Sequence, residues 1–231
     1  EEWRRGWHPE KFEAAGSSDR LLVLGAGPAG LEAALIAARR GYQVTIADKR
    51  EQFGGRLIFE TSLPGLNTWG RVRDYRLQAL QQMSNVDMYP GSEMGADDLL
   101  AMEHGHIVIA TGARWTRFLY SSLEIPVGQM NQPGVYTPED LAAGIVPQGP
   151  VLVYDFDNYY MGGVVAEMLA DKGLKVSYAT PAGHASAWTV MTNELPFIHQ
   201  ALFKKKIDMS TLMLLKSFDG QSAQLENSRA V

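Results

Sequence analysis

Three glycines and one aspartate within residues 21–48 have the clearest chemical meaning in this sequence. Gly25, Gly27 and Gly30 lie between an apolar run and an alanine-rich stretch, and Asp48 ends the next apolar run. In such a pattern the first glycine makes a tight turn, the second lets the backbone approach a pyrophosphate, and the third lets a helix pack on a strand. An acid at the place of Asp48 accepts hydrogen bonds from an adenosine ribose. A glycine-rich turn without a ligand is the alternative, but the whole pattern favours nucleotide binding.

The elements around these residues explain how they would be positioned. A strand at Leu21–Leu24 leads into the turn, and a helix begins near Pro28, so that its free N–H groups and its dipole would favour phosphate. Beyond Asp48, the adjacent glycines Gly54 and Gly55 predict a second loop that approaches the nucleotide closely.

Further strands and helices continue the same α/β pattern up to residue 113. Helical spacing occurs at Thr68–Gln82 and at Asp97–Glu103, and Val86–Tyr89 reads as a short strand. The β-branched run that starts at His106 and stops in the glycine turn at Ala110–Ala113 predicts a buried parallel strand that ends at a ligand crevice.

The second half of the chain repeats this pattern after an irregular stretch. Residues 114–148 contain four prolines and one helical hint at Pro138–Ala143, so we expect a connection between domains. A second strand, helix and strand follow from Val151. A helix around Asn193–Lys205 and a hairpin of strands Met209–Phe218 and Ser222–Leu225 complete the prediction. The predicted domains are a linker (1–17), a nucleotide-binding domain (18–115), a connection (116–147) and a degenerate second domain (148–231).

The second unit has lost the residues that bind phosphate. Asp155 and Asp157 stand where the first unit has glycines, and like charges there would repel a pyrophosphate. The two aspartates are expected to cap the following helix instead. The alternative is that Gly162-Gly163 opens a different path for a ligand.

Composition narrows the classes of function. The chain has 231 residues, a net charge of -5 and no cysteine, so it offers no basic face for nucleic acid and no thiolate for an iron–sulfur cluster. No apolar run is long enough to span a membrane, and no signal peptide is visible, so we expect a cytoplasmic protein. Because the chain begins at Glu1 rather than at methionine, we expect it to be part of a longer one.

An ordered series of motifs resembles one family of flavoproteins. The GAGPAG turn, the FGGRL loop, LPGLNTWGRVRDYR, IVIATGARW and the degraded second unit are similar to the C-terminal part of trimethylamine, dimethylamine and histamine dehydrogenases and, more distantly, of 2,4-dienoyl-CoA reductase. The resemblance implies an α/β fold of two Rossmann-like units with parallel sheets, as in glutathione reductase, within a larger enzyme.

The family resemblance also implies cofactors and partners. Members carry FMN in an N-terminal barrel, a 4Fe–4S cluster after it, and ADP or FAD in the first Rossmann-like unit. An oxidoreductase that oxidises amines is therefore expected for the longer protein, with electron-transfer flavoprotein as acceptor and a homo-oligomeric assembly. The barrel, the cluster cysteines and a final strand returning to the first unit are absent from these residues, which alone cannot perform the oxidation. Residues implied to contact or lie near the nucleotide are Gly25, Gly27, Pro28, Ala29, Gly30, Asp48, Lys49, Gly55, Arg56, Leu57, Trp69, Arg73, Ala110, Thr111 and Gly112.

The sequence leaves two other functions open. A reductase using FAD with NAD(P)H is one alternative, and a structural or partner-docking module that holds a nucleotide without redox chemistry is another. The five histidines lack metal-binding spacing, and no serine lies in a Gly-x-Ser-x-Gly motif, so neither a metal site nor a hydrolase is predicted.

Overall fold

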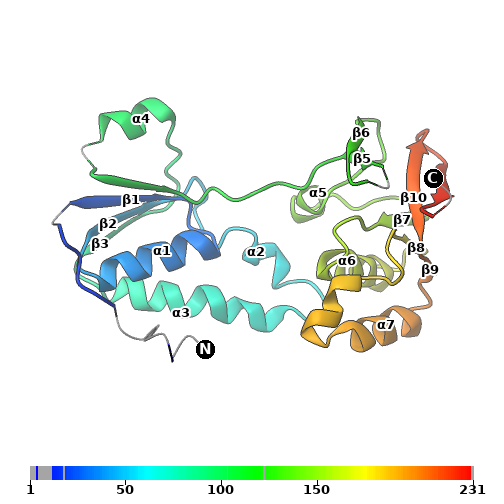
Figure 1. Ribbon diagram of the computed structural model, residues 1–231, viewed down its shortest axis with the longest axis horizontal. Coiled ribbons are helices and arrows are strands. Elements are labelled where there is room, and N and C mark those ends of the chain that lie inside the picture. Colours follow the sequence, from blue (N-terminus) through cyan, green and yellow to red (C-terminus); the bar gives the residue numbers. More distant parts are fainter. Residues whose placement is uncertain (1–3, 5–11, 18, 103, 122, 230–231) are drawn as a thin grey trace. The chain divides into compact units, whose positions relative to one another are not determined.

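The chain folds into two compact α/β units. The computed structural model describes residue 4 and residues 12–17, 19–102, 104–121 and 123–229 (Figure 1). The first unit contains the described residues up to 62 and Leu66–Ala113, and the second contains Leu63–Gly65 and the described residues from 114 on. This architecture confirms the predicted fold class. Most of the predicted linker 1–17 lies outside the described residues, and the predicted domain boundaries stay predictions.

A four-stranded parallel sheet forms the centre of the first unit. Its strands are β1 (Arg20–Leu24), β2 (Gln43–Ala47), β3 (Val86–Tyr89) and β4 (His106–Ile109), in the order β3-β2-β1-β4. Leu24 at the end of β1 pairs with Ala47 of β2 and with Ile109 of β4. The carboxyl ends of these strands therefore lie together at one end of the sheet, where ligands of open α/β folds bind.

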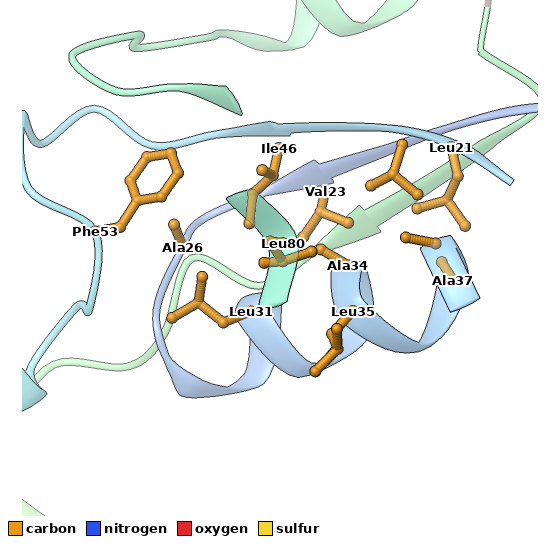
Figure 2. Packing of buried hydrophobic residues seen from close by; sticks show 12 residues of the cluster. Leu21, Val23, Ala26, Leu31, Ala34, Leu35, Ala37, Ile46, Phe53 and Leu80 are labelled. Atoms are coloured by element: carbon orange, nitrogen blue, oxygen red, sulfur yellow. The ribbon is translucent and has the colours of Figure 1, made fainter. Parts of the chain in front are cut away.

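Two long helices cover one face of this sheet. They are α1 (Pro28–Arg39) and α3 (Gly70–Gln81), while α4 (Ala96–Ala101) lies on the other side (Figure 1). Apolar residues of α1 recur every three or four positions and pack against the strands together with Leu80 of α3 (Figure 2). The buried cluster consists of Leu21, Val23, Ala26, Leu31, Ala34, Leu35, Ala37, Ala38, Val44, Ile46, Phe53 and Leu80.

Two short helices connect the sheet to α3. These are α2 (Leu57–Glu60) and the 3-10 helix η2 (Asn67–Trp69), which runs directly into α3. The helix predicted at Thr68–Gln82 is confirmed, with its first turn in the tighter 3-10 form. The helix predicted at Asp97–Glu103 corresponds to α4.

The prediction that the strand after His106 is buried is wrong. β4 pairs with β1 and has no second neighbour among the described strands, so it forms an edge of the sheet. Ile107 is 40% exposed and Ile109 is 69% exposed. A run of β-branched residues predicts a strand whether or not both faces are covered, and the run itself does not say which.

The second unit repeats the β-α-β arrangement, as the sequence predicts. Strands β7 (Val151–Tyr154), β8 (Val176–Ala179) and β9 (Asp208–Ser210) form a parallel sheet in that order. Helix α6 (Tyr160–Asp171) joins β7 to β8, and the 3-10 helix η3 (Ala187–Thr192) and α7 (Leu195–Lys204) lie between β8 and β9. The helix predicted around Asn193–Lys205 is thus confirmed.

Two predictions about the second half need correction. The connection 116–147 is not wholly irregular, because β5 (Phe118–Tyr120) and β6 (Pro126–Gln129) pair in antiparallel fashion before α5 (Pro138–Ala142). The strand predicted at Met209–Phe218 is two strands. Leu212 has a positive φ of 58° and separates β9 from β10 (Met213–Phe218), which pairs with β11 (Ala223–Asn227).

In the part of the chain that the structure describes, no helix is long and apolar enough to cross a membrane.

Candidate functional site

Two of the three glycines are required by contacts within the protein. Gly25 has a φ of +100°, and a Cβ atom added to it would lie 2.3 Å from the carbonyl oxygen of Ala110. A Cβ atom added to Gly30 would lie 1.8 Å from the carbonyl oxygen of Gly25. Both positions therefore exclude a side chain even without a ligand, since these backbone atoms cannot move away cheaply.

Gly27 differs from its two neighbours in the motif. Its φ of -74° and ψ of -177° suit any residue, and a Cβ atom added there would meet only the Cα atom of Gly55, at 3.9 Å. A Cβ atom added to Gly55, in contrast, would lie 2.8 Å from the Cα atom of Gly27. Bare backbone from two loops thus borders a cradle that a side chain at residue 27 would fill.

The amino end of α1, where the helix dipole places a partial positive charge, borders this cradle. The helix has twelve residues, begins with Pro28, has no side-chain cap and carries no acidic residue in its first turn. The first N–H groups of an α-helix have no partner within the helix, and the helix dipole adds a partial positive charge there. Ala29 and Gly30 supply these N–H groups, which suit a phosphate.

Asp48 is tied to the glycine turn by hydrogen bonds. Its side chain is only 8% exposed, Oδ2 accepts the N–H of Ala26 at 2.7 Å, and Oδ1 accepts the N–H of Arg50 at 2.8 Å. The carbonyl oxygen of Ala26 in turn accepts the N–H of Gly54 at 2.8 Å. Because a carboxylate has about four lone-pair sites, Asp48 can hold the turn and still accept ribose hydroxyls.

The remaining predicted residues fall into two groups. Ala110 and Thr111 lie directly behind Gly25, where the N–H of Ala110 donates to the carbonyl oxygen of Leu24 at 2.7 Å. The side chain of Arg73 lies beside Gly54, because a Cβ atom on that glycine would be 2.6 Å from Arg73 Cδ. The contacts therefore join the glycine turn, Asp48, the 54–55 loop and the 110–111 turn into one site.

The second group has its described contacts elsewhere. Lys49 is exposed and its ammonium lies 3.7 Å from Glu93, and Arg56 pairs with Glu60 at 2.8 Å. Leu57 is buried as the first residue of α2, Trp69 is the half-buried last residue of η2, and Gly112 is exposed with a φ of +81°. Their places beside a nucleotide stay predictions.

Sequence reasoning missed one residue that organises the site. Ala26 carries both the N–H that Asp48 accepts and the carbonyl that Gly54 donates to. These are backbone groups, so residue type gives no signal for them.

The described part of the first unit has a hollow at either end of its parallel strands. A cavity of about 500 Å³ is lined by residues of the loop after β2, by α3 and by the end of β3, among them Phe53, Arg73 and Met88. A larger one of about 610 Å³ lies beside Leu21 and His106, at the amino ends of β1 and β4. The second is thus at the opposite end of the strands from the glycine turn.

The corresponding turn of the second unit is filled by its own side chains. Asp155 is 4% exposed, accepts the N–H of Asn158 at 2.9 Å through Oδ1, and accepts the hydroxyl of Tyr178 through Oδ2. Burial raises the pKa of Asp155 to about 6, against the opposing effect of its hydrogen bonds. A Cβ atom on Gly162 would lie 2.6 Å from Asp155 Cγ, so this glycine is needed to make room for the carboxyl group.

The prediction that the two aspartates cap α6 is wrong. The N-cap position of α6 is Tyr159, and no side chain caps the helix. The carboxyl group of Asp155 lies beside Gly162 in the first turn of α6, but it accepts the N–H of Asn158 and the hydroxyl of Tyr178 rather than an N–H of the helix. Across the described residues, no group of three or more metal-ligating side chains lies close enough to hold a metal ion.

Comparison with known proteins identifies relatives over most of the chain. Residues 19–140 match the pyridine nucleotide-disulphide oxidoreductase family. Dimethylamine dehydrogenase of Hyphomicrobium sp. (strain x) is 40% identical over 192 residues, which are 79% of this chain and 26% of that protein.

Solved structures agree with this relationship. The 6-hydroxypseudooxynicotine amine oxidase of Pseudomonas geniculata N1 has a TM-score of 0.92 and 44% identity, and histamine dehydrogenase of Rhizobium sp. 4-9 has a TM-score of 0.91 and 40% identity. Each alignment covers 99% of this chain, and 34% and 36% of the respective structures. Thioredoxin reductase of T. acidophilum, at 16% identity and a TM-score of 0.55, shares the fold.

The chain therefore spans about a quarter to a third of these longer relatives. The glycine turn, its acid and the sheet that positions them are the parts that the family match covers. The resemblance predicted from the motifs is confirmed, and the chain belongs to the pyridine nucleotide-disulphide oxidoreductase family, with dimethylamine and histamine dehydrogenases among its relatives.

Proposed function

We propose that the first unit binds the ADP moiety of an adenine nucleotide, as ADP itself or as the ADP half of FAD, within an amine-oxidising flavoprotein. The observation that carries this proposal is the cradle at Gly27. Its backbone conformation does not demand glycine, and no neighbouring atom excludes a side chain there. A ligand that passes over the backbone would explain the glycine, which the fold itself does not.

Three groups fit such a ligand. The N–H groups at the start of α1 would meet the pyrophosphate, bare backbone at Gly27 and Gly55 would let it approach, and the free lone pairs of Asp48 would accept ribose hydroxyls. ADP would supply no redox chemistry, whereas FAD would supply a flavin that accepts and donates electrons. The protein groups bind and orient the ligand in either case.

We favour ADP over FAD as the resident nucleotide. ADP needs only the glycine turn, Asp48 and the 54–55 loop, and all three are joined in one site here. A flavin would extend beyond the turn at Ala110–Ala113, where Thr111, Gly112 and Ala113 are exposed. No described residue of the first unit covers that side.

Amine oxidation is proposed for the longer protein. Relatives named for amine substrates match this chain at 40% identity or more, which supports an amine dehydrogenase. FMN and a 4Fe–4S cluster in regions beyond these residues are the part of the proposal that rests on the resemblance of the sequence motifs. Electron-transfer flavoprotein as acceptor, a homo-oligomer and a cytoplasmic location belong to the same proposal. An NAD(P)H-dependent reductase is disfavoured because Asp155 fills the turn of the second unit.

The test compares a blocked cradle with a matched control. Gly27→Val adds a side chain where the extended backbone accepts one, so the protein should fold yet lose ADP binding. Gly16→Val is the control, since Gly16 is exposed and a Cβ atom there meets nothing within 4 Å. A saturating ligand, at 100 times its Kd, should stabilise the parent and the control by about 2.7 kcal/mol and leave Gly27→Val unchanged.

Isothermal titration and thermal unfolding with ADP measure these effects. Equal ADP affinity for the parent and Gly27→Val would disprove the cradle, and no binding to any of the three proteins would disprove the proposed ligand. The absorption spectrum of the purified protein separates the two nucleotides. We expect adenine nucleotide without a visible flavin band, and a band that persists through gel filtration would replace ADP by FAD.

A further inference from the structure

Five residues join two loops of the second unit in a polar network that is largely buried. Asp155 and Asn158 belong to the turn after β7, and Tyr178, Thr180 and Ser186 belong to β8 and the loop that follows it. We call this group the latch. Asp155, Thr180 and Ser186 are buried, with exposures of 4%, 0% and 0%, and Tyr178 has an exposure of 0%.

Each connection of the latch crosses from one loop to the other or fixes a loop in place. Tyr178 donates its hydroxyl to Asp155, and the N–H of Ser186 donates to the Tyr178 oxygen at 3.1 Å. The hydroxyl of Thr180 donates to Asn158 Oδ1 at 2.6 Å, while the N–H of Trp188 donates to the carbonyl oxygen of Asn158 at 2.8 Å. Asn158 accepts these bonds in the left-handed conformation, with a φ of 60°.

The centre of the latch is a buried carboxyl group without a cation beside it. The Ser186 hydroxyl is buried and acts on the Tyr178 oxygen as a donor, so Tyr178 connects Ser186 with Asp155. Asp155 itself is 4% exposed, and a negative charge at such a place is costly unless a positive charge compensates it. Burial therefore favours the neutral carboxyl group, although the hydrogen bonds that Asp155 accepts oppose this effect.

We propose that Asp155 is the centre of a proton-operated latch, which holds the β7–α6 turn against the loop after β8 when the carboxyl group is neutral and loosens when it ionises. The titratable groups that act on Asp155 in the described part of the chain are Tyr154, Tyr178 and Asp157, and none of them carries a positive charge. Loosening would open the turn after β7, which corresponds to the glycine turn of the first unit.

The direction of the pH effect follows from burial. Burial raises the pKa of Asp155 from 3.8 to about 6, so the folded latch binds its proton more tightly than the unfolded chain. The stabilisation is therefore fully present below pH 3.8 and is lost as the pH rises through about 6. Between pH 5 and pH 8 the equilibrium constant for opening the latch should rise about tenfold.

Hydrogen exchange of the 231-residue protein measures this opening directly. Exchange rates at residues 155–160 and 186–190, corrected for the intrinsic effect of pH, should give the tenfold rise with a midpoint near pH 6. Asp155→Asn mimics the neutral acid, so its opening should not vary with pH. Asp157→Asn is the comparison in the same turn: it removes an exposed negative charge that raises the pKa of Asp155, so its opening should still depend on pH, with a midpoint below that of the parent.

Three results would overturn the latch. Two of them concern its opening: an opening that does not change between pH 5 and pH 8 in the parent, and the same pH dependence in Asp155→Asn as in the parent. A carbon-13 titration of the Asp155 carboxyl group in the unmodified protein needs no variant to fold. It should show a midpoint near pH 6, and a midpoint near pH 4 would likewise overturn the proposal.

Discussion

The turns after β1 and after β7 differ in where their carboxylate comes from. In the first unit the acid, Asp48, comes from the end of the neighbouring strand and reaches back to the N–H of Ala26. In the second unit the acid, Asp155, lies in the turn itself and reaches forward to Tyr178 on the neighbouring strand. The first arrangement leaves the turn as bare backbone, and the second fills it with side chains.

The difference teaches that one βαβ framework can either bind a ligand or replace it. Gly30 and Gly162 are each the third residue of their helix, and each makes room for the first residue after the strand. Gly30 makes room for the backbone of Gly25, whereas Gly162 makes room for the side chain of Asp155. The helix packs closely in both units, but only the first unit leaves space beyond it.

Gly30→Ala should have the largest effect on this comparison. The new Cβ atom would lie 1.8 Å from a carbonyl oxygen of the backbone, so strand and helix must separate. We expect a loss of more than about 3 kcal/mol in the free energy of unfolding of the first unit. Urea unfolding measures it, and a change below about 1 kcal/mol would show that the turn adapts.

Gly162→Ala should cost less, because its clash is with a side chain. We expect a loss of about 1–3 kcal/mol in the second unit. The double variant with Asp155→Gly removes the clashing group, so the two losses should not add in a double-mutant cycle. Strict additivity in urea unfolding would mean that Gly162 and Asp155 do not interact as their geometry indicates.

A third prediction compares Asp155 with a carboxylate of the opposite kind. Asp140 accepts the N–H of Thr137 at 2.7 Å and pairs with Arg117, and these contacts, the Thr137 bond foremost, lower the pKa of Asp140. Its stabilisation is present above pH 3.8 and is lost as the pH falls through its lowered pKa. Asp140→Asn should therefore cost about 1 kcal/mol at pH 7, and progressively less as the pH falls below 3.8.

Measuring the unfolding of Asp140→Asn across this pH range checks the sign. A loss that grows toward low pH would contradict the assignment. Because Asp155 has the reverse dependence, the two carboxylates together should make the second unit less stable both as the pH rises from 3.8 to about 6 and as it falls below 3.8.

The glycine turn was predictable because backbone sterics fix both its residue types and their spacing. Gly25 and Gly30 have no alternative in this geometry, so the sequence alone indicates the strand, the turn and the helix. The helices α3 and α7 were predictable for a similar reason, since their apolar residues recur at helical spacing.

The parts that the sequence did not reveal depend on tertiary contacts. The β5–β6 pair is short and contains a proline, so its pattern resembles a loop. The bond from Ala26 to Asp48 involves a backbone donor, and the role of Asp155 depends on Tyr178, which is twenty-three residues away. Exposure of β4 depends on which strands lie beside it, which its own residues do not encode.

The contact between Asp155 and Gly162 also limits how the second unit can change. Replacing Asp155 by glycine would remove the only described acceptor for the Tyr178 hydroxyl and leave a void against Gly162. Restoring a phosphate-binding turn would therefore require coordinated replacements at residues 155, 158 and 178. Single substitutions along that route pass through less stable proteins, so the loss of the second nucleotide site is difficult to reverse, both for evolution and for protein engineering.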